Sequence, residues 1–192
     1  QYGQAPDPRT VAAKNIKSEY QDEYILGFDH QFDPAWVWGM KGMVRRLKNA
    51  LDDVCDSQAI QQAAIAKGYD LSQLSVGACY LSNPGRANVY DLATANGGYA
   101  TVKVSNADFG FPHLKRNYYS LEAYLSHPFD GTWSGKIDYV YSRSYGNSEG
   151  QVRSDVGQQD VAASRDWDYA ELMDYANGYL PNDRKHQIKI YG

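Results

Sequence analysis

The sequence NYYSLEAYLSHPFDGTWSGKIDYVYSRS, residues 117–144, contains two arms in which apolar and polar side chains alternate. One face of the first arm carries Tyr119, Leu121, Ala123 and Leu125, and the other carries Tyr118, Ser120, Glu122, Tyr124 and Ser126. In the second arm, Trp133, Gly135, Ile137, Tyr139 and Tyr141 alternate with Ser134, Lys136, Asp138, Val140 and Ser142. A period of two is typical of a strand whose faces differ. Because turn formers at residues 127–131 separate the arms, the stretch predicts a β-hairpin.

Each arm is about ten residues long, which is the length that a tilted strand needs to cross the hydrocarbon core of a bilayer. In a soluble sandwich the apolar face would meet a second sheet, whereas in an outer-membrane barrel it would meet lipid. Alternation does not separate these architectures. Because soluble antiparallel sheets are common, this hairpin by itself slightly favours the soluble one.

Residues 19–52 repeat the pattern around a short turn at 33–35. The apolar positions of this second hairpin are Tyr20, Tyr24, Leu26, Phe28 and Phe32 in one arm and Trp36, Trp38, Met40 and Val44 in the other. Aromatic rings therefore flank both turns, as Phe129 and Trp133 do in the first hairpin. Such rings are typical of the aromatic girdle at a membrane interface. With both hairpins considered, the barrel and the sandwich are equally favoured.

Tyrosine is the compositional outlier, with 17 Tyr against 5 Phe in 192 residues. Rings with one polar end are typical of membrane interfaces and of binding loops on surface proteins. The net charge is −4 and the Lys and Arg residues are scattered, which disfavours nucleic-acid binding. No apolar run is long enough for a transmembrane helix. The chain has neither a signal peptide nor an initiator Met and stops within an expected strand, so we expect a piece of a longer protein.

A long polar segment near 53–112 separates the two hairpins. Within it, Ser57–Lys67 is predicted to form a short helix with Ser57 as its N-cap. Cys55 and Cys79 bracket this helix and fit no zinc-binding spacing. We predict a disulfide between them, which would contribute roughly 3 kcal/mol and indicate an oxidising compartment, and the alternative is two buried free thiols.

A second long polar segment, near 146–183, follows the 117–144 hairpin. Trp167–Tyr175 is predicted to form a turn or two of helix, and Arg184–Tyr191 resumes the alternation of a strand. Short turns and long loops thus alternate along the chain. Short turns on one side and long loops on the other are typical of outer-membrane barrels.

Four stretches of the chain resemble the barrel region of TonB-dependent outer-membrane receptors, and more narrowly the Oar-like, OmpA-related branch of that family. They are EYQDEYILGFDHQF (19–32), WVWGMKGMVRRLKNALDDVCD (36–56), RNYYSLEAYLSHPFDGTWSGKIDYVYSRSYGNSEG (116–150) and LPNDRKHQIKIYG (180–192). The resemblance covers nearly the whole chain. It implies an all-β fold: an antiparallel transmembrane β-barrel segment of about four to five strands from a larger barrel. The implied strands lie near 19–32, 36–52, 115–127, 133–145 and 184–192, with extracellular loops near 53–112 and 146–183.

The resemblance also implies a function. Receptors of this family bind a ligand at the cell surface and move it across the outer membrane, so the implied localisation is the cell outer membrane. The implied partners are the remainder of the barrel and its plug, the TonB system through the missing N-terminal part, and outer-membrane lipid and lipopolysaccharide. The plug domain is absent from this chain. The alternative from another class is a secreted or surface β-sandwich that binds glycan or protein without transport.

Ligand contacts are expected in the loops, because function on rigid scaffolds usually lies there. The candidates are Tyr80, Tyr90, Trp167, Asp168 and Tyr169. Internal packing of a long ordered loop is the alternative role for each of them.

Other constellations point to no chemistry of their own. The four His residues show no ligand spacing, and no catalytic or cofactor signature is present, so we expect neither an enzyme nor a cofactor. Asp52, Asp53 and Asp56 match no calcium-loop spacing and are interpreted as a solvated strand end, so no metal site is predicted. Basic residues near the expected outer strand ends either bind lipopolysaccharide phosphates through charge-assisted hydrogen bonds or are ordinary charged residues at the rim of the barrel. They are Arg45, Arg46, Lys48, Lys115, Arg116, Arg184 and Lys185.

Overall fold

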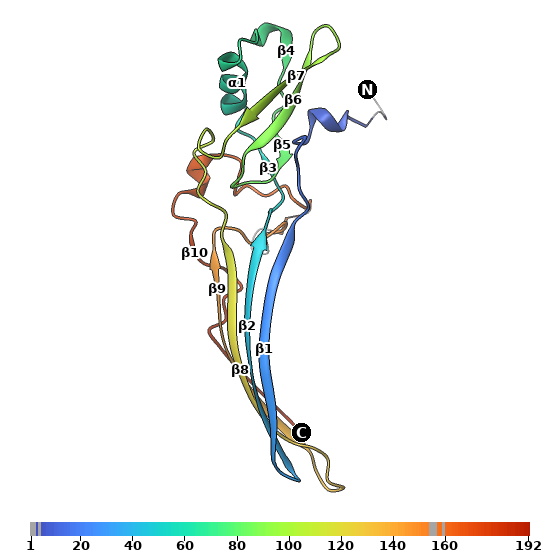
Figure 1. Cartoon of the computed structure of the whole chain (residues 1–192), viewed down its shortest axis with the longest axis vertical. Coiled ribbons are helices and arrows are strands. Elements are labelled where there is room, and N and C mark those ends of the chain that lie inside the picture. Colours follow the sequence, from blue (N-terminus) through green and yellow to red (C-terminus); the bar gives the residue numbers. More distant parts are fainter. Residues whose placement is uncertain (1–2, 4, 154–156, 159) are drawn as a thin grey trace. The chain divides into compact units, whose positions relative to one another are not determined.

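The computed structural model of the chain describes residues 3, 5–153, 157–158 and 160–192. Strands dominate these residues, which confirms the all-β fold class (Figure 1). The chain divides into two compact units. We call residues 21–47, 115–146 and 178–192 the strand unit, and residues 1–20, 48–114 and 147–177 the loop unit. The sequence has no composition shift that would predict this division.

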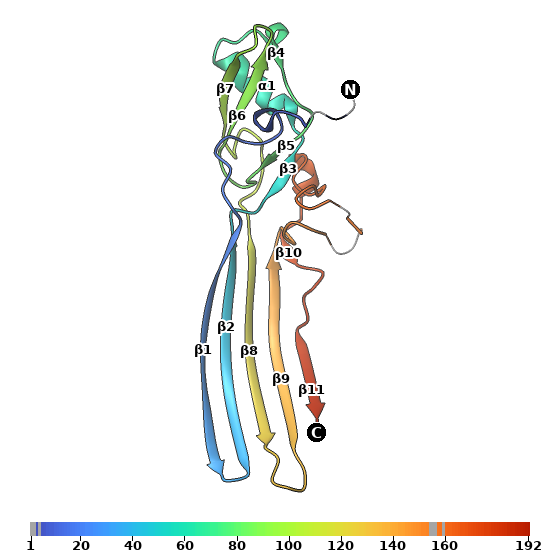
Figure 2. The same ribbon diagram turned by 90° about the vertical axis from the view of Figure 1, so that its right-hand side faces the viewer.

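The strand unit is built on four long strands that lie side by side (Figure 2). In order across the sheet they are β1 (Tyr20–Asp33), β2 (Trp36–Lys48), β8 (Arg116–His127) and β9 (Gly135–Gly146). Two shorter strands, β10 (Gly178–Tyr179) and β11 (His186–Tyr191), both pair antiparallel with β9. Within the described residues this sheet is open, with β1 at one edge and β11 at the other, so a closed barrel is not formed.

The register places the alternating side chains as the sequence predicts. Leu121 lies opposite Tyr141 and Leu125 opposite Ile137, so the apolar residues of β8 and β9 share one face. Glu122 lies opposite Lys41 on β2, on the other face. Because the side-chain period of a strand is two, one matched pair determines the face of every residue in both strands.

The apolar face of this sheet is exposed. Leu26 of β1 is 84% exposed and Ile190 of β11 is 73% exposed, and Leu121 in the centre of the sheet is also exposed. Large exposed apolar patches are rare on soluble monomers. Where they occur, they usually mark surfaces that bind a protein partner or a membrane.

Aromatic rings cluster at the turn ends of β2, β8 and β9. The ring of Trp133 stacks on His127 with centroids 3.8 Å apart, and Trp36 meets Trp133 edge to face at 5.9 Å. His127 is buried by these contacts. The two hairpin turns of the strand unit therefore share one aromatic cluster, which the sequence showed only as two separate sets of rings.

The loop unit has regular structure of its own. A three-stranded sheet runs in the order β4 (Leu74–Ser75), β6 (Asn88–Thr94) and β7 (Tyr99–Val104), and β3 (Asp52–Val54) pairs with β5 (Tyr80–Ser82). The helix α1 spans Ser57–Ala66. Three 3-10 turns complete the unit: η1 (Pro8–Thr10), η2 (Leu71–Gln73) and η3 (Ala170–Met173).

Both segments that sequence analysis assigned to loops contribute to one hydrophobic core. Its fully buried members include Ile60, Tyr80, Tyr90, Leu92, Val102, Val104 and Trp167. The N-terminal residues also belong to this unit, since Ala12 pairs with Leu81 and Ala13 is buried. The N-cap of α1 is Asp56, which accepts a hydrogen bond from the Ala59 amide at 3.1 Å, and not Ser57 as predicted. No helix in the described part of the chain is long and apolar enough to cross a membrane.

Candidate functional site

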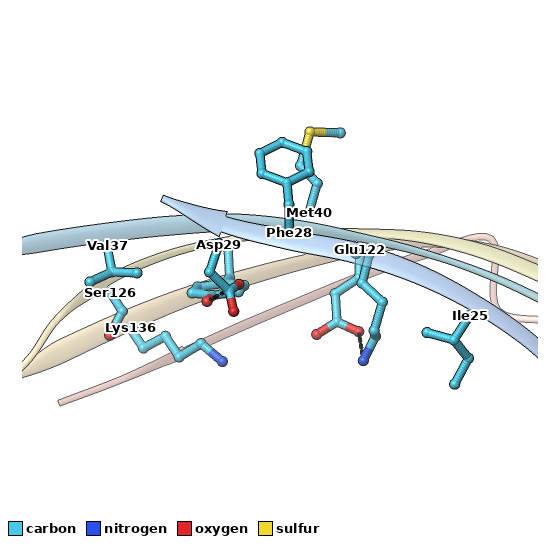
Figure 3. A pocket seen from close by; sticks show the side chains of 11 residues that line it. Ile25, Phe28, Asp29, Val37, Met40, Glu122, Ser126 and Lys136 are labelled. Carbon is cyan, nitrogen blue, oxygen red and sulfur yellow. Dashed lines mark hydrogen bonds and ion pairs between the residues drawn. The ribbon is translucent and has the colours of Figure 1, made fainter. Parts of the chain in front are cut away.

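The polar face of the strand unit carries a shallow depression of about 590 Å³. Figure 3 shows Asp29, Glu122 and Lys136 on one side of the strands, with Phe28 and Met40 projecting from the opposite side. The depression is lined from β1, β2, β8 and β9. Successive residues of a strand point to opposite faces, which is why Phe28 and Asp29 separate in this way.

Several charged side chains of this face form ion pairs with one another. The Lys41 ammonium lies 3.0 Å from the Glu122 carboxylate, and the Lys136 ammonium lies 2.8 Å from Asp138. Tyr191 donates a hydrogen bond to Asp138 at 3.0 Å. The pairing leaves the face polar with its charges compensated, so it suits contact with water or with a polar protein surface.

A tyrosine bridges β8 and β1 across β2. The Tyr124 hydroxyl donates to Asp29 Oδ1 at 2.5 Å. Its ring lies over Gly39, where an added Cβ would come within 2.5 Å of the ring. Gly39 is paired with Tyr124 in the register and leaves the space that the ring occupies. Covering a strand glycine with a cross-strand aromatic ring is a known device for pinning strand register.

The loop unit contains a disulfide between Cys55 and Cys79, with a Cα–Cα distance of 4.0 Å. Asp168 Oδ1 lies 3.1 Å from the Cys55 sulfur, and Asp53 is also close to it. These groups surround a disulfide, whose sulfurs have no proton to donate and no thiolate charge to offer a metal ion. Although Asp53, Cys55 and Cys79 lie within ligand distance of one another, they do not form a metal site.

The acidic residues 52–56 do not form the solvated strand end that sequence analysis expected. Asp52 is buried, and it accepts hydrogen bonds from the amide of Ser164 at 2.7 Å and from the Ser164 hydroxyl. Burial raises the pKa of Asp52 to about 6, although the bonds from Ser164 act in the opposite direction. Burial also raises the pKa of Asp53 and of Asp168. With Asp52 bound to Ser164 and Asp56 capping α1, these carboxylates do not converge as calcium ligands do.

The predicted ligand contacts lie in different environments. Tyr80, Tyr90 and Trp167 are at most 1% exposed, so their side chains are packing residues of the loop-unit core. Asp168 is half-buried beside the disulfide. Only Tyr169 among the five predicted contacts is exposed.

Sequence analysis missed two exposed apolar residues close to Tyr169, namely Leu172 and Tyr175. A signal for them is present in the sequence, because DYAELMDYA (168–176) repeats every three residues. The basic rim residue Arg45 is paired with Glu23 and lies over the Tyr118 ring at 5.5 Å, so part of the expected rim charge is compensated within the sheet.

Comparison with known curated proteins finds a relative that matches most of this chain. The chain is similar to the TonB-dependent transporter Oar of Myxococcus xanthus, with 31% identity over 147 residues. The match covers 74% of this chain and 14% of the relative, so the chain spans a small part of that transporter's length. No family model matches the chain. No solved structure matches it either.

Proposed function

We propose that this chain is a barrel segment of a TonB-dependent transporter in the outer membrane, within a protein that binds a ligand at the cell surface and moves it across that membrane. The observation that carries the proposal is the exposed apolar face of four adjacent strands, backed by a polar face with paired charges. The similarity to the Oar transporter supports the choice of a TonB-dependent transporter.

The dimensions of the sheet support this role. The strands β1, β2, β8 and β9 have 14, 13, 12 and 12 residues, and a tilted barrel strand needs about 9–11 to cross the apolar layer. The aromatic cluster of Trp36, His127 and Trp133 at the turns then lies at one membrane interface, as barrel girdles do. The two open edges, β1 and β11, would pair with further strands of the intact barrel, because unpaired backbone groups are costly in lipid.

The polar face would line the lumen. Its compensated charge suits the polar surface of a plug domain, and the plug and the TonB system are the partners that we propose for the whole protein. The loop unit would supply surface-facing residues. We retain the expectation that the chain is not an enzyme.

The alternative is a secreted β-sandwich. That fold needs a second sheet over the face that carries Leu26, Leu121 and Ile190, and the described residues of the strand unit supply none. The open apolar face therefore favours a lipid-facing role.

The test is to locate the intact protein in cells that contain it. Trypsin releases the peptide of residues 117–136, which reports the central hairpin. We expect this peptide in a heat-modifiable outer-membrane band, together with peptides of a plug domain from the same polypeptide. Its recovery only from a small species that remains in solution without detergent would overturn the proposal and favour the sandwich.

A further inference from the structure

Residues 168–176 of the loop unit, DYAELMDYA, consist of three triplets of one kind. Each triplet begins with an acidic residue, continues with Tyr or Leu, and ends with Ala or Met. A 3-10 helix has three residues per turn, so residues three apart share one side of it. Within the segment, Ala170–Met173 forms such a turn, η3, and the sides of the remaining residues follow from their burial.

The third residue of each triplet faces the core. Met173 is buried, and Ala170 and Ala176 pack against the hydrophobic core of the loop unit. The backbone is held by turn hydrogen bonds, from the Leu172 amide to the Tyr169 carbonyl at 3.2 Å and from Ala176 to Met173 at 3.2 Å. The segment is thus a short ribbon anchored along one side.

The second residue of each triplet faces solvent. Tyr169 is 48% exposed, Leu172 is 52% exposed and Tyr175 is 103% exposed. Three large side chains are therefore exposed on a backbone that is anchored by its other residues.

Tyr175 adopts a backbone conformation that is unfavourable for its side chain. Asp174 has φ −60° and ψ 126°, and Tyr175 has φ 61°. Together with the bond from Ala176 to Met173, these angles describe a type II turn with Tyr175 at the position that normally requires Gly or Asn. A fully exposed Tyr gains little from packing in its own chain, so nothing within the loop unit offsets this strain.

The first residues of the last two triplets add uncompensated charge beside this row. Glu171 and Asp174 are exposed, and neither forms an ion pair with the described residues. Asp168 differs because it lies against the disulfide. The exposed side chains of the segment are thus apolar at the second position of each triplet and anionic at the first position of the last two.

We propose that Tyr169, Leu172 and Tyr175, with Glu171 and Asp174 beside them, form a docking surface for a polypeptide segment that presents apolar side chains flanked by Lys or Arg. Exposed tyrosines are frequent anchors of protein interfaces. Charge complementarity selects a cationic partner. The aliphatic Leu172 at the centre favours apolar side chains over sugar rings, which stack on aromatic faces. This inference goes beyond the transport role, and it does not depend on it.

The experiment measures binding of fluorescent peptides to the whole chain in detergent micelles, with empty micelles as the blank. One probe is a short peptide of leucines flanked by lysines, and matched probes replace the lysines by glutamates or the leucines by serines. We expect saturable binding of the first probe, weakening with salt, and none of the other two. Neutral oligosaccharides serve as a third class of probe.

Variants separate docking from folding. Tyr175→Gly and Tyr175→Asn relieve the strained turn, so both raise the melting temperature while weakening peptide binding by about tenfold or more. Leu172→Ser weakens binding, whereas Ile65→Ser on α1, which removes an exposed side chain of similar size, leaves it unchanged. Glu171→Gln with Asp174→Asn reduces the salt dependence.

Three results would overturn the proposal. They are absence of saturable binding by the cationic apolar peptide, equal binding by the folded Tyr175→Gly and unmodified chains, and binding of oligosaccharide in place of peptide at this surface. Because the Tyr175 variants are expected to be more stable than the parent chain, a loss of binding in them is not attributable to unfolding.

Discussion

Asp52 and Ser164, which are 112 residues apart, are joined by two hydrogen bonds to one buried carboxylate. The Ser164 amide donates to one oxygen of Asp52 and the Ser164 hydroxyl donates to the other. This contact connects the two long segments that form the loop unit. It also makes the stability of the unit sensitive to pH.

Asp52 is expected to destabilise the fold as pH rises. Its pKa is about 6 in the folded chain against an ordinary value of 3.8, so between about pH 4 and pH 6 the unfolded chain loses this proton while the folded chain keeps it. The free energy of unfolding therefore falls through this range by about 3 kcal/mol and then levels off. Thermal melts of the whole chain between pH 3.5 and 8 should show this decrease.

Asp52→Asn should flatten that profile, because Asn keeps an acceptor for the Ser164 amide without a charge. The variant should be more stable than the parent above about pH 7 and similar to it near pH 4. Asp160→Asn, which removes an exposed carboxylate of the same unit, is the control that should leave the slope intact. If the stability of the parent chain did not change between pH 4 and 6, the raised pKa of Asp52 would be contradicted.

Asn83 is expected to hold the N-terminal segment in place. It is buried, accepts a bond from the Lys17 amide at 2.7 Å, and donates to the carbonyls of Lys17 and Ala50 at 2.9 and 3.1 Å. Asn83→Asp replaces the donor by a buried carboxylate facing carbonyl oxygens, so it should cost about 3 kcal/mol or more.

The measurement for Asn83 is limited trypsin digestion, because release of the segment exposes the bonds after Lys14 and Lys17. Cleavage there should be faster in Asn83→Asp than in the parent chain. Asn96→Asp, in the exposed turn between β6 and β7, is the matched control and should leave the rate unchanged. Equal cleavage rates in the parent chain and both variants would contradict the role of Asn83 in holding the N-terminal segment.

The disulfide should contribute substantially to the loop unit. It closes a loop with a sequence separation of 24, for which chain entropy predicts about 3 kcal/mol. The double variant Cys55→Ser with Cys79→Ser should therefore melt at a lower temperature than the oxidised chain. The parent chain melted with a reductant should match the variant, and a reductant effect that persists in the variant would show another cause.

Charges on the apolar face of the strand unit should prevent insertion into lipid. Leu121→Lys should cost roughly 2–4 kcal/mol near the bilayer centre, whereas Ile137→Lys, closer to the turn of the hairpin, should cost less. Ser120→Lys, on the opposite face of β8, should cost much less, because that face carries paired charges. The measurement is folding into phosphatidylcholine vesicles across a urea series, and equal effects of Leu121→Lys and Ser120→Lys would contradict a lipid-facing role.

Local alternation was sufficient to predict β1, β2, β8, β9 and β11, whereas β10 lies in a segment that was predicted to be a loop. Each long strand was recognisable because side chains such as Glu122 and Leu121 point to opposite faces of a pleated chain, and this rule needs no distant partner. The helix α1 was predicted from local helix signals, with an error of one residue at its N-cap.

The tertiary contacts of the loop unit were not predictable from local patterns. They join residues far apart in sequence, as Asp52 joins Ser164 and Asn83 joins Lys17. Composition cannot distinguish Tyr90, which is fully buried, from Tyr175, which is fully exposed. Four of the five predicted ligand contacts therefore occupy the core or the disulfide environment, while two exposed neighbours of Tyr169 were missed.

The sequence by itself determined the all-β class, the hairpins and the face of each strand residue, because the period of a strand is a property of the backbone alone. Tertiary structure decided which rings are core and which are surface, that Cys55 pairs with Cys79, and that the long segments form a core. These outcomes depend on burial, which results from packing between distant segments and has no local sequence signature.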